Sequence, residues 1–312
     1  MSKDRLQEEI LKLKKKRDVT ILAHYYQPIE IQEIADHLGD SLGLSRLANK
    51  VDTKYIIFAG VLFMAETASI LNQDKKVLIP HPEAYCPLAA YLDGEKVKTF
   101  REKYPGLPVI TYVNSTAAVK AESDICCTSS NAMAITKVMA KEYGTDAVLF
   151  GPDSNLGDYV EQKSGIKTII MPHDGHCIVH SQLSAQDVLT AKKDHPDTEV
   201  LVHPECKREV RDLADVVGST AHMYNHVKNS SNGDRFLIGT EKGLLERMAQ
   251  DFPENQFFLI SEKLICYNMK KNSLELTKHV LEHLEDPDHE VRVPKDIAKR
   301  AYAPIEKMLK LS

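Results

Sequence analysis

The sequence repeats itself three times, and no other feature constrains the fold as strongly. Three segments align along the chain: ILAHYYQPIEIQEIADHLGDS, ITYVNSTAAVKAESDICCTSS and LVHPECKREVRDLADVVGST. Each begins with a short apolar run that ends, in turn, at His24, Tyr112 or His203, so the copies are offset by 88 and 91 residues. These offsets exceed the roughly 20–50 residues of solenoid repeats. We therefore expect three homologous globular units.

Further positions are equivalent in the three copies. Two residues after the end of each apolar run stand Tyr26, Asn114 and Glu205. An aspartate follows twelve residues after that end and a hydroxyl five residues later, which gives Asp36, Asp124, Asp215 and then Ser41, Ser129, Thr220. In the second half of each copy a cysteine follows a strand-ending glycine after 26, 26 and 27 residues, and these cysteines are Cys86, Cys177 and Cys266.

Short apolar runs bounded by Gly and Pro alternate with helical stretches such as NAMAITKVMAKEYG. This alternation predicts βαβ units and parallel sheets. We expect an α/β fold of three homologous αβα sandwich domains, each with a short parallel sheet of about four strands, in a pseudo-threefold arrangement around a central active site. The repeat places the three domains at residues 18–96, 97–186 and 187–272. Residues 1–17, with Leu6, Ile10 and Leu13 on the inner face, and 273–312 would form terminal helices packing on the outside.

Composition excludes several classes of protein. Forty Lys and Arg against 45 Asp and Glu give a net charge of -5, whereas a general nucleic-acid binder is expected to be basic. No apolar run approaches the ~18 residues that a membrane span needs. The N-terminal stretch mixes both charges and lacks the apolar region of a signal peptide. Six cysteines in 312 residues are too sparse for a disulfide scaffold. We expect a cytoplasmic protein with no nucleic-acid and no membrane partner.

The repeated cysteines predict a metal centre. Ligands of parallel sheets bind beyond the carboxyl ends of the strands, where all three cysteines fall. Zinc is one alternative, but structural zinc sites usually draw paired ligands from C-x-x-C spacings, which are absent here. A 4Fe-4S cluster is normally held by four thiolates. Three would leave one iron open as a Lewis acid for removing hydroxyls. The other cysteines, Cys126, Cys127 and Cys206, align with non-cysteine residues and are expected to be buried apolar side chains.

The repeated polar residues predict a shared cavity. Ser41, Ser129 and Thr220 stand where a strand turns into a helix, so they are candidates to cap that helix, to help its N-terminus bind an anion, or to do both at once. The positions at and after the first strand of each unit supply two imidazoles, two phenols and a carboxylate, which are groups that general acid–base catalysis uses. Three histidines close to Cys177 in the sequence have no equivalents in the other copies. They are expected either to contact the site residues from behind or to lie at the surface: His173, His176 and His180.

A series of motifs resembles the quinolinate synthase family. These motifs are HYYQ at 24–27, GDSLGLSR at 39–46, CPLA at 86–89, YVNSTAAVKA at 112–121, CTSSNA at 127–132, HPEC at 203–206, VGST at 217–220, IGTE at 238–241 and CYNMKKNSLE at 266–275. The resemblance covers nearly the whole chain from about residue 20. Two positions depart from the family pattern: His173 replaces a usual Trp, and Cys266 lacks the extra cysteine pair of many bacterial members. The chain therefore resembles the compact three-cysteine form.

The resemblance implies a transferase that condenses iminoaspartate with dihydroxyacetone phosphate to quinolinate, with loss of phosphate and two waters. It implies a 4Fe-4S cluster on Cys86, Cys177 and Cys266. It also implies that the substrates bind to His24, Ser41, Tyr112, Asn114, Ser129, His203, Glu205 and Thr220. Tyr26, Glu205 and His203 are the implied catalytic residues. The enzyme that supplies iminoaspartate is a candidate partner.

Two other classes of protein remain open from the sequence. An aconitase-type hydro-lyase would share the open iron but would need no phosphorylated second substrate. An iron–sulfur redox sensor would use the same cysteines without a polar cavity, and the acid–base residues at the strand ends speak against it.

Overall fold

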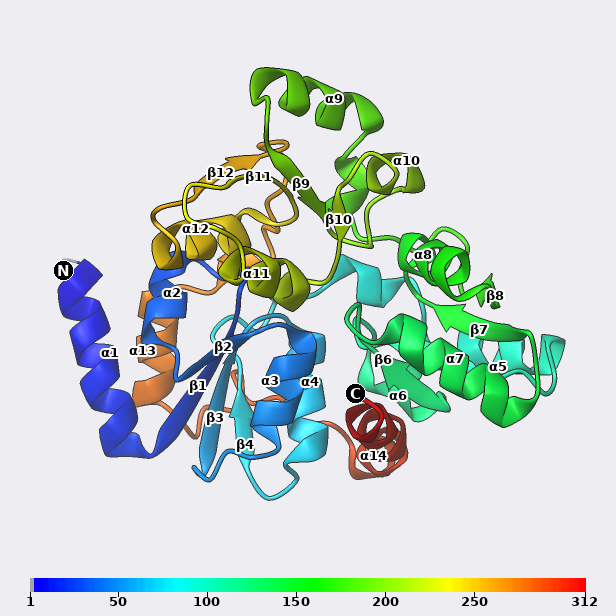
Figure 1. Ribbon diagram of the computed structural model, residues 1–312. Coiled ribbons are helices and arrows are strands. Elements are labelled where there is room, and N and C mark those ends of the chain that lie inside the picture. Colours follow the sequence, from blue (N-terminus) through cyan, green and yellow to red (C-terminus); the bar gives the residue numbers. More distant parts are fainter. Residues whose placement is uncertain (1–2) are drawn as a thin grey trace.

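The computed structural model describes residues 3–312, and three four-stranded sheets organise this part of the chain. The strand order is the same in each sheet: β2-β1-β3-β4, β6-β5-β7-β8 and β10-β9-β11-β12. Every strand pair within these sheets is parallel. The prediction of three αβα units with about four parallel strands each is confirmed. Figure 1 shows the three units side by side, with helices against the sheets.

The same order of elements recurs in each unit. The first contains β1 (Val19–His24), α2 (Ile29–Ile34), β2 (His37–Gly39), α3 (Ser41–Ala48), β3 (Tyr55–Ala59), α4 (Leu62–Leu71), β4 (Lys76–Leu78) and the 3-10 helix η1 (Pro87–Ala90). The second contains α5 (Gly94–Lys103), β5 (Val109–Tyr112), α6 (Ala117–Ala121), β6 (Ile125–Cys127), α7 (Ala132–Tyr143), β7 (Ala147–Gly151), α8 (Ser154–Ser164), β8 (Lys167–Ile170) and η2 (His180–Gln182). The third contains α9 (Ala185–Asp194), β9 (Glu199–Val202), α10 (Arg208–Arg211), β10 (Val216–Val217), α11 (Thr220–Lys228), β11 (Arg235–Gly239), α12 (Lys242–Asp251), β12 (Gln256–Leu259) and η3 (Met269–Lys271).

The first strands of the units are apolar on both faces because both faces of the sheet are covered. All six residues of β1 are buried. Ile21 and Leu22, which are consecutive residues of β1, belong to different hydrophobic clusters, since successive side chains of a strand point to opposite faces. Leu201 and Val202 of β9 divide in the same way. Continuous apolar runs are typical of parallel sheets that are covered by helices on both sides.

The repeated aspartates brace the start of each sheet. Asp36 Oδ2 accepts a hydrogen bond from the backbone N–H of Ile21 at 2.8 Å, and the N–H of Asp36 donates back to the Ile21 carbonyl at 2.9 Å. Asp124 makes the same pair of bonds with Val109. Asp215 makes them with Val200. These aspartates therefore fix the edge strand beside the first strand.

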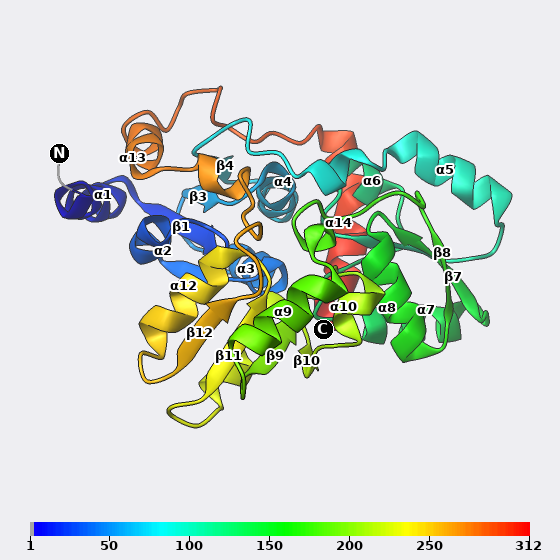
Figure 2. The same cartoon turned by 90° about the horizontal axis from the view of Figure 1, so that it is seen from above.

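The terminal helices pack on the first two units. Helix α1 (Lys3–Arg17) lies against α13 (Leu274–Glu282), and Figure 2 shows the two side by side at one end of the molecule. Leu6 and Ile10 of α1 are buried, whereas Leu13 is half-buried. Helix α14 (Lys295–Lys310) packs instead on α6, β6 and α4.

The predicted boundaries at residues 97 and 187 lie within α5 and α9, and the division into domains stays a prediction. None of the helices within residues 3–312 has the length and apolar character needed to cross a membrane.

The three units meet at one point through their strand-to-helix loops. Ser130 of the second unit donates to Asp40 Oδ2 of the first unit at 2.9 Å and bonds Ser219 Oγ of the third at 2.8 Å. Asp40 and Ser219 stand directly before α3 and α11, and each also accepts a bond from its own helix. The starts of these helices are thereby held together beside the cavity described below.

Candidate active site

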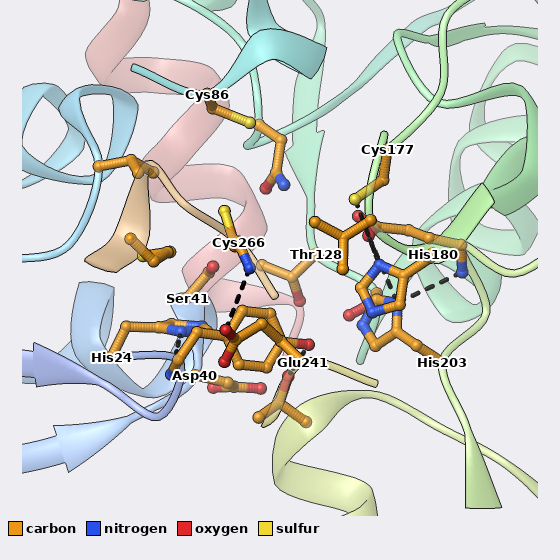
Figure 3. Close-up of a pocket in the computed structure, with 18 of the residues that line it drawn as sticks. His24, Asp40, Ser41, Cys86, Thr128, Cys177, His180, His203, Glu241 and Cys266 are labelled. Atoms are coloured by element: carbon orange, nitrogen blue, oxygen red, sulfur yellow. Dashed lines mark hydrogen bonds and ion pairs between the residues drawn. The ribbon is translucent and has the colours of Figure 1, made fainter. Parts of the chain in front are cut away.

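All the residues that were predicted from the sequence to form the active site line one cavity. The space between its lining residues, counted together with the part that is open to solvent, is about 670 Å³. The predicted residues among its lining are His24, Tyr26, Ser41, Cys86, Tyr112, Asn114, Ser129, Cys177, His203, Glu205, Thr220 and Cys266. Each of the three units contributes at least three of them. Figure 3 shows the thiols of Cys86, Cys177 and Cys266 around one space, with His24 and His203 below them in this view.

The two repeated histidines are neutral hydrogen-bond donors. Nδ1 of His24 accepts the backbone N–H of Tyr26 at 3.1 Å, and Nδ1 of His203 accepts that of Glu205 at 3.3 Å. The turn after each strand therefore leaves the ring proton on Nε2. Burial lowers the pKa of each imidazole to about 3. A buried neutral imidazole of this tautomer offers an N–H to a ligand in the cavity.

Glu205 is a buried carboxylate beside two imidazoles. Its Oε2 lies 2.6 Å from His180 Nδ1 and 3.6 Å from His203 Nδ1. Burial alone would raise the pKa of Glu205, but its electrostatic interaction with His203 and its hydrogen bond with His180 hold the pKa below its usual range. Glu205 is therefore ionised at neutral pH, and it can accept a proton.

A chain of hydrogen bonds joins Glu205 to Tyr26. His180 Nδ1 donates to Glu205, so its Nε2 accepts from Thr240 Oγ1 at 2.9 Å. Thr240 Oγ1 then accepts from the Tyr26 hydroxyl at 2.7 Å, and that hydroxyl accepts from Thr220 Oγ1 at 3.0 Å. Burial raises the pKa of Tyr26 well above its usual value, so the phenol is protonated. The chain connects a proton donor with a proton acceptor.

The repeated hydroxyls line the cavity and do not cap the helices. Asp40 and Ser219 are the capping residues of α3 and α11, and they accept N–H groups of the first turn. Ser41 and Thr220 occupy the next position, the first of each helix. The alternative that these two hydroxyls are N-caps is wrong, because the preceding residue has taken that role. Their position beside two helix N-termini suits an anionic group.

Two buried oxygens in the cavity have no partner among the described residues. They are Asn114 Oδ1 and Glu205 Oε1. Buried polar atoms are nearly always hydrogen-bonded, so an unpaired one at a cavity wall indicates a polar ligand. Both atoms can only accept hydrogen bonds. The ligand therefore carries N–H or O–H groups.

Two buried carboxylates hold two of the cysteine loops. Asp153, directly before α8, accepts the backbone N–H of Cys177 at 2.9 Å, and Glu241, directly before α12, accepts that of Cys266 at 3.1 Å. Gly175 lets the Cys177 loop approach closely, since a Cβ there would lie 2.0 Å from the Pro152 carbonyl oxygen. In the first unit Val61 stands at the equivalent position before α4. Its side chain cannot accept a hydrogen bond, so the Cys86 loop has no equivalent bond to an acidic side chain.

The three repeated thiols suit a metal centre. Burial raises the pKa of Cys86 to about 12 and also raises the pKa of Cys177 and of Cys266. Each of these residues is half-buried, whereas Cys126, Cys127 and Cys206 are fully buried in the hydrophobic core. None of the three forms a disulfide, and a free thiol becomes a metal ligand by releasing its proton. The same wall contains a second set of side chains that could hold a metal ion, because ligand atoms of Cys177, His180 and Glu205 lie within 4.8 Å of one another.

Four polar residues of the cavity wall were not predicted from the sequence: Asp40, Thr128, His180 and Glu241. His173 is exposed and His176 is half-buried, which agrees with the prediction for them. His180, however, is buried at the centre of the hydrogen-bond chain. Its position three residues after Cys177 was the only indication, and it has no equivalent in the other units, where Ala89 and Met269 stand.

Fold and site together define an enzyme, since a buried carboxylate, neutral imidazoles, a buried phenol and three thiols face one cavity between three α/β units. The comparisons with known proteins identify which enzyme family this is. Residues 8–310 match the family model described as quinolinate synthetase A protein. The chain belongs to the quinolinate synthase family.

Curated relatives agree with the family over nearly their full length. A quinolinate synthase of Pyrococcus abyssi is 47% identical over 305 residues, which cover 98% of this chain and 99% of the relative. Those of Thermotoga maritima and Thermodesulfovibrio yellowstonii are 45% and 46% identical over 304 and 308 residues, covering 97% and 99% of this chain and 99% of each relative.

Proposed function

We propose that this chain condenses iminoaspartate with dihydroxyacetone phosphate to quinolinate, with loss of phosphate and two waters. Quinolinate supplies the pyridine ring of NAD, so the reaction belongs to NAD biosynthesis. The observation that carries the proposal is the single cavity, to which the three repeated units bring their thiols, acid–base groups and hydroxyls. An enzyme that supplies iminoaspartate is the expected partner.

Cys86, Cys177 and Cys266 would hold a 4Fe-4S cluster. Three thiols from three separate loops at one wall fit such a cluster, and the nearby cysteines of the core lie outside the cavity lining. When bound, the cluster supplies an open iron that polarises a hydroxyl for dehydration. Asp153 and Glu241 fix the backbone of two of the three ligands.

The polar wall would bind and orient the substrates. Ser41 and Thr220 stand at two helix N-termini, where a phosphate or carboxylate is stabilised. The Ser41 hydroxyl can donate to such a group, whereas the Thr220 hydroxyl donates to Tyr26. His24 and His203 donate their Nε2–H groups. Tyr112, Asn114 and Ser129 complete the wall from the second unit, and the unpaired Oδ1 of Asn114 accepts an N–H or O–H of the substrate.

Proton transfers are assigned to Glu205, Tyr26 and His203. Glu205 is ionised and accepts a proton at Oε1, the oxygen left free by His180. Tyr26 is protonated and would donate to the substrate once its hydroxyl turns away from Thr240, and the chain through Thr240 and His180 would link Tyr26 with Glu205 for proton exchange. A positioned acid or base typically contributes about 10²–10⁴-fold to a rate.

Anaerobic purification followed by iron and sulfide analysis tests the metal centre. About four of each per chain is the expected result. Zinc, or no metal after anaerobic reconstitution, would overturn the cluster, and zinc would point instead to the group of Cys177, His180 and Glu205.

Phosphate release tests the reaction. The proposed activity requires both substrates and releases phosphate together with quinolinate. An aconitase-type hydro-lyase would dehydrate a single hydroxy acid and release no phosphate. A redox sensor would show neither reaction.

A further inference from the structure

A second group of metal-ligating side chains lies away from the cavity, at the end of α13. Ligand atoms of His279, Asp286 and His289 all lie within 4.8 Å of one another. His279 belongs to α13, whereas Asp286 and His289 belong to the segment that leads to α14. None of the three lines the candidate active site.

Two of these side chains are already oriented by the backbone. His289 is 8% exposed, and its Nδ1–H donates to the Ile79 carbonyl at 3.0 Å, which leaves Nε2 with a free lone pair. Asp286 Oδ1 accepts the backbone N–H of Asp288 at 3.0 Å. The other oxygen, Oδ2, faces His279 Nε2 at 4.0 Å. Metal-binding histidines almost always donate their second ring N–H to a carbonyl or carboxylate in this way.

The group joins two separately anchored segments. Residues next to His289 add to the edge of the first sheet, because Ile79 N–H donates to the His289 carbonyl and Val291 N–H donates to the Val77 carbonyl. Helix α13 packs on α1. Figure 2 shows the segment leaving α13, passing β4 and reaching α14. A bond between helix and segment would therefore fix the path of the chain between its last two helices.

We propose that His279, Asp286 and His289 bind a divalent first-row transition metal of the Zn²⁺ type as a structural site. Two imidazoles and one carboxylate are ligands that zinc prefers, whereas Ca²⁺ and Mg²⁺ take oxygen ligands. The remaining positions are open to water or to His283. That ring lies 4.4 Å from the ring of His279, and its Nδ1–H is bound to the His279 carbonyl.

Titration of the anaerobically reconstituted protein with Zn²⁺, followed by calorimetry and by thermal unfolding, tests the site. His279→Gln and Asp286→Asn each remove one ligand from a partly exposed position, so both variants should fold. His226→Gln is the matched control, because His226 lies outside this group and its ring nitrogen pairs with the carboxylate of Glu199, at 2.9 Å.

The wild type should bind one Zn²⁺ per chain at this site, and binding should raise its Tm. His279→Gln and Asp286→Asn should weaken binding by at least about tenfold and lose the Tm increase, while His226→Gln keeps both. Wild type without a Zn²⁺-dependent Tm increase, or His279→Gln with unchanged affinity, would overturn the site. If the proposed cluster were absent, Zn²⁺ could bind to the free cysteines of the cavity, and this binding would remain in both ligand variants. Failure of the proposed cluster can therefore be told apart from failure of the site at the end of α13.

Discussion

The hydroxyl of Tyr26 lies 2.7 Å from Oγ1 of Thr240. The two residues come from different units, since Tyr26 follows β1 and Thr240 follows β11. Thr240 is fully buried and also contacts His180. The Thr240 hydroxyl therefore connects the phenol of Tyr26, in the first unit, through His180 to the carboxylate of Glu205, in the third.

Thr240→Val should break this link. The substitution keeps the shape of the side chain but leaves the Tyr26 hydroxyl without its acceptor and His180 Nε2 without its donor. Because the proposed proton exchange between Tyr26 and Glu205 runs through Thr240, and positioned acid–base groups contribute about 10²–10⁴-fold to a rate, we expect kcat to fall about 10-fold or more. Thr240→Ser retains the hydroxyl and should stay near wild type. Equal rates in Thr240→Val and wild type would exclude the chain from catalysis.

Glu205→Gln should lower turnover by at least ~100-fold while the visible spectrum of the metal centre is unchanged, since a positioned acid–base group contributes about that much. The change is nearly isosteric, and the amide oxygen can still accept from His180. Steady-state rates and absorption spectra of the same preparation provide the measurement. Glu209→Gln, on the exposed side of α10, is the control. Wild-type turnover with the centre intact would remove Glu205 from the catalytic residues.

His24 should make folding stability fall in acid. Burial lowers the pKa of His24 to about 3 in the folded state, whereas an unfolded histidine has a pKa of about 6.5. Between these values the unfolded chain binds a proton that the folded chain does not. The stability contributed by neutral His24 is thus present above about pH 6.5 and is lost as the pH falls toward 3.

His24→Asn isolates this contribution. The Asn oxygen can replace Nδ1 as the acceptor of the Tyr26 N–H, but it does not titrate. Relative to wild type, the variant should gain about 1.4 kcal/mol of unfolding free energy for each pH unit of acidification between pH 6 and 4. Urea unfolding at several pH values measures the difference. Parallel curves for the two proteins would show that folding does not lower the pKa of His24.

The fold could be predicted from the sequence because each strand and its polar end recur at a fixed spacing. In a parallel βαβ unit the carboxyl ends of the strands share one edge, so the equivalence of His24, Tyr112 and His203 places each of them at that edge of its own unit. Their meeting at one cavity followed only from the expected pseudo-threefold arrangement. Asp36 and its equivalents were recognised as repeated, but their bonds to the first strand follow only from the three-dimensional register.

The connections between units could not be predicted, because they depend on residues without repeat equivalents. His180 and Thr240 meet across two units, and no spacing in the sequence relates them. The role of Ser41 also required the structure. A hydroxyl at a strand-to-helix turn suits a cap, and only the geometry shows that Asp40 has taken that position.

Glu241 should stabilise the Cys266 loop. Its carboxylate accepts from the N–H groups of Cys266 and Gly243 and is paired with Lys270 at 3.1 Å. Glu241→Gln replaces one acceptor oxygen by a donor and leaves the partly buried ammonium without its counter-ion. We expect a loss of about 1–3 kcal/mol in unfolding free energy and a faster loss of metal in air.

Glu246→Gln, on the same helix, provides the comparison. Glu246 forms an i,i+4 ion pair with Lys242 at 3.8 Å, and both side chains are partly exposed. Such pairs contribute about 0.3–0.5 kcal/mol. If both variants were destabilised equally, the buried position of Glu241 would have no particular importance for the loop.

The three cysteines that line the cavity are expected to hold metal, whereas Cys127 and Cys206 fill the core. Cys86, Cys177 and Cys266 come from different units, so no neighbouring thiol can replace any one of them. Alanine at each of these positions should abolish or severely destabilise the metal centre and end quinolinate formation. Cys206→Ser should retain it, because the new hydroxyl can donate to the Gly239 carbonyl, which Cys206 Sγ contacts at 3.6 Å.

Cys127→Ser should likewise keep its metal, at the cost of burying a hydroxyl in the core, where Cys127 is 0% exposed. Iron per chain and the visible absorption band, measured after anaerobic reconstitution of all five variants, decide between the two groups. The core cysteines should differ from wild type in unfolding free energy and not in iron content. Loss of iron in Cys206→Ser together with its retention in the Cys266→Ala variant would contradict the threefold assignment, because the repeat gives Cys206 no equivalent at the cavity wall.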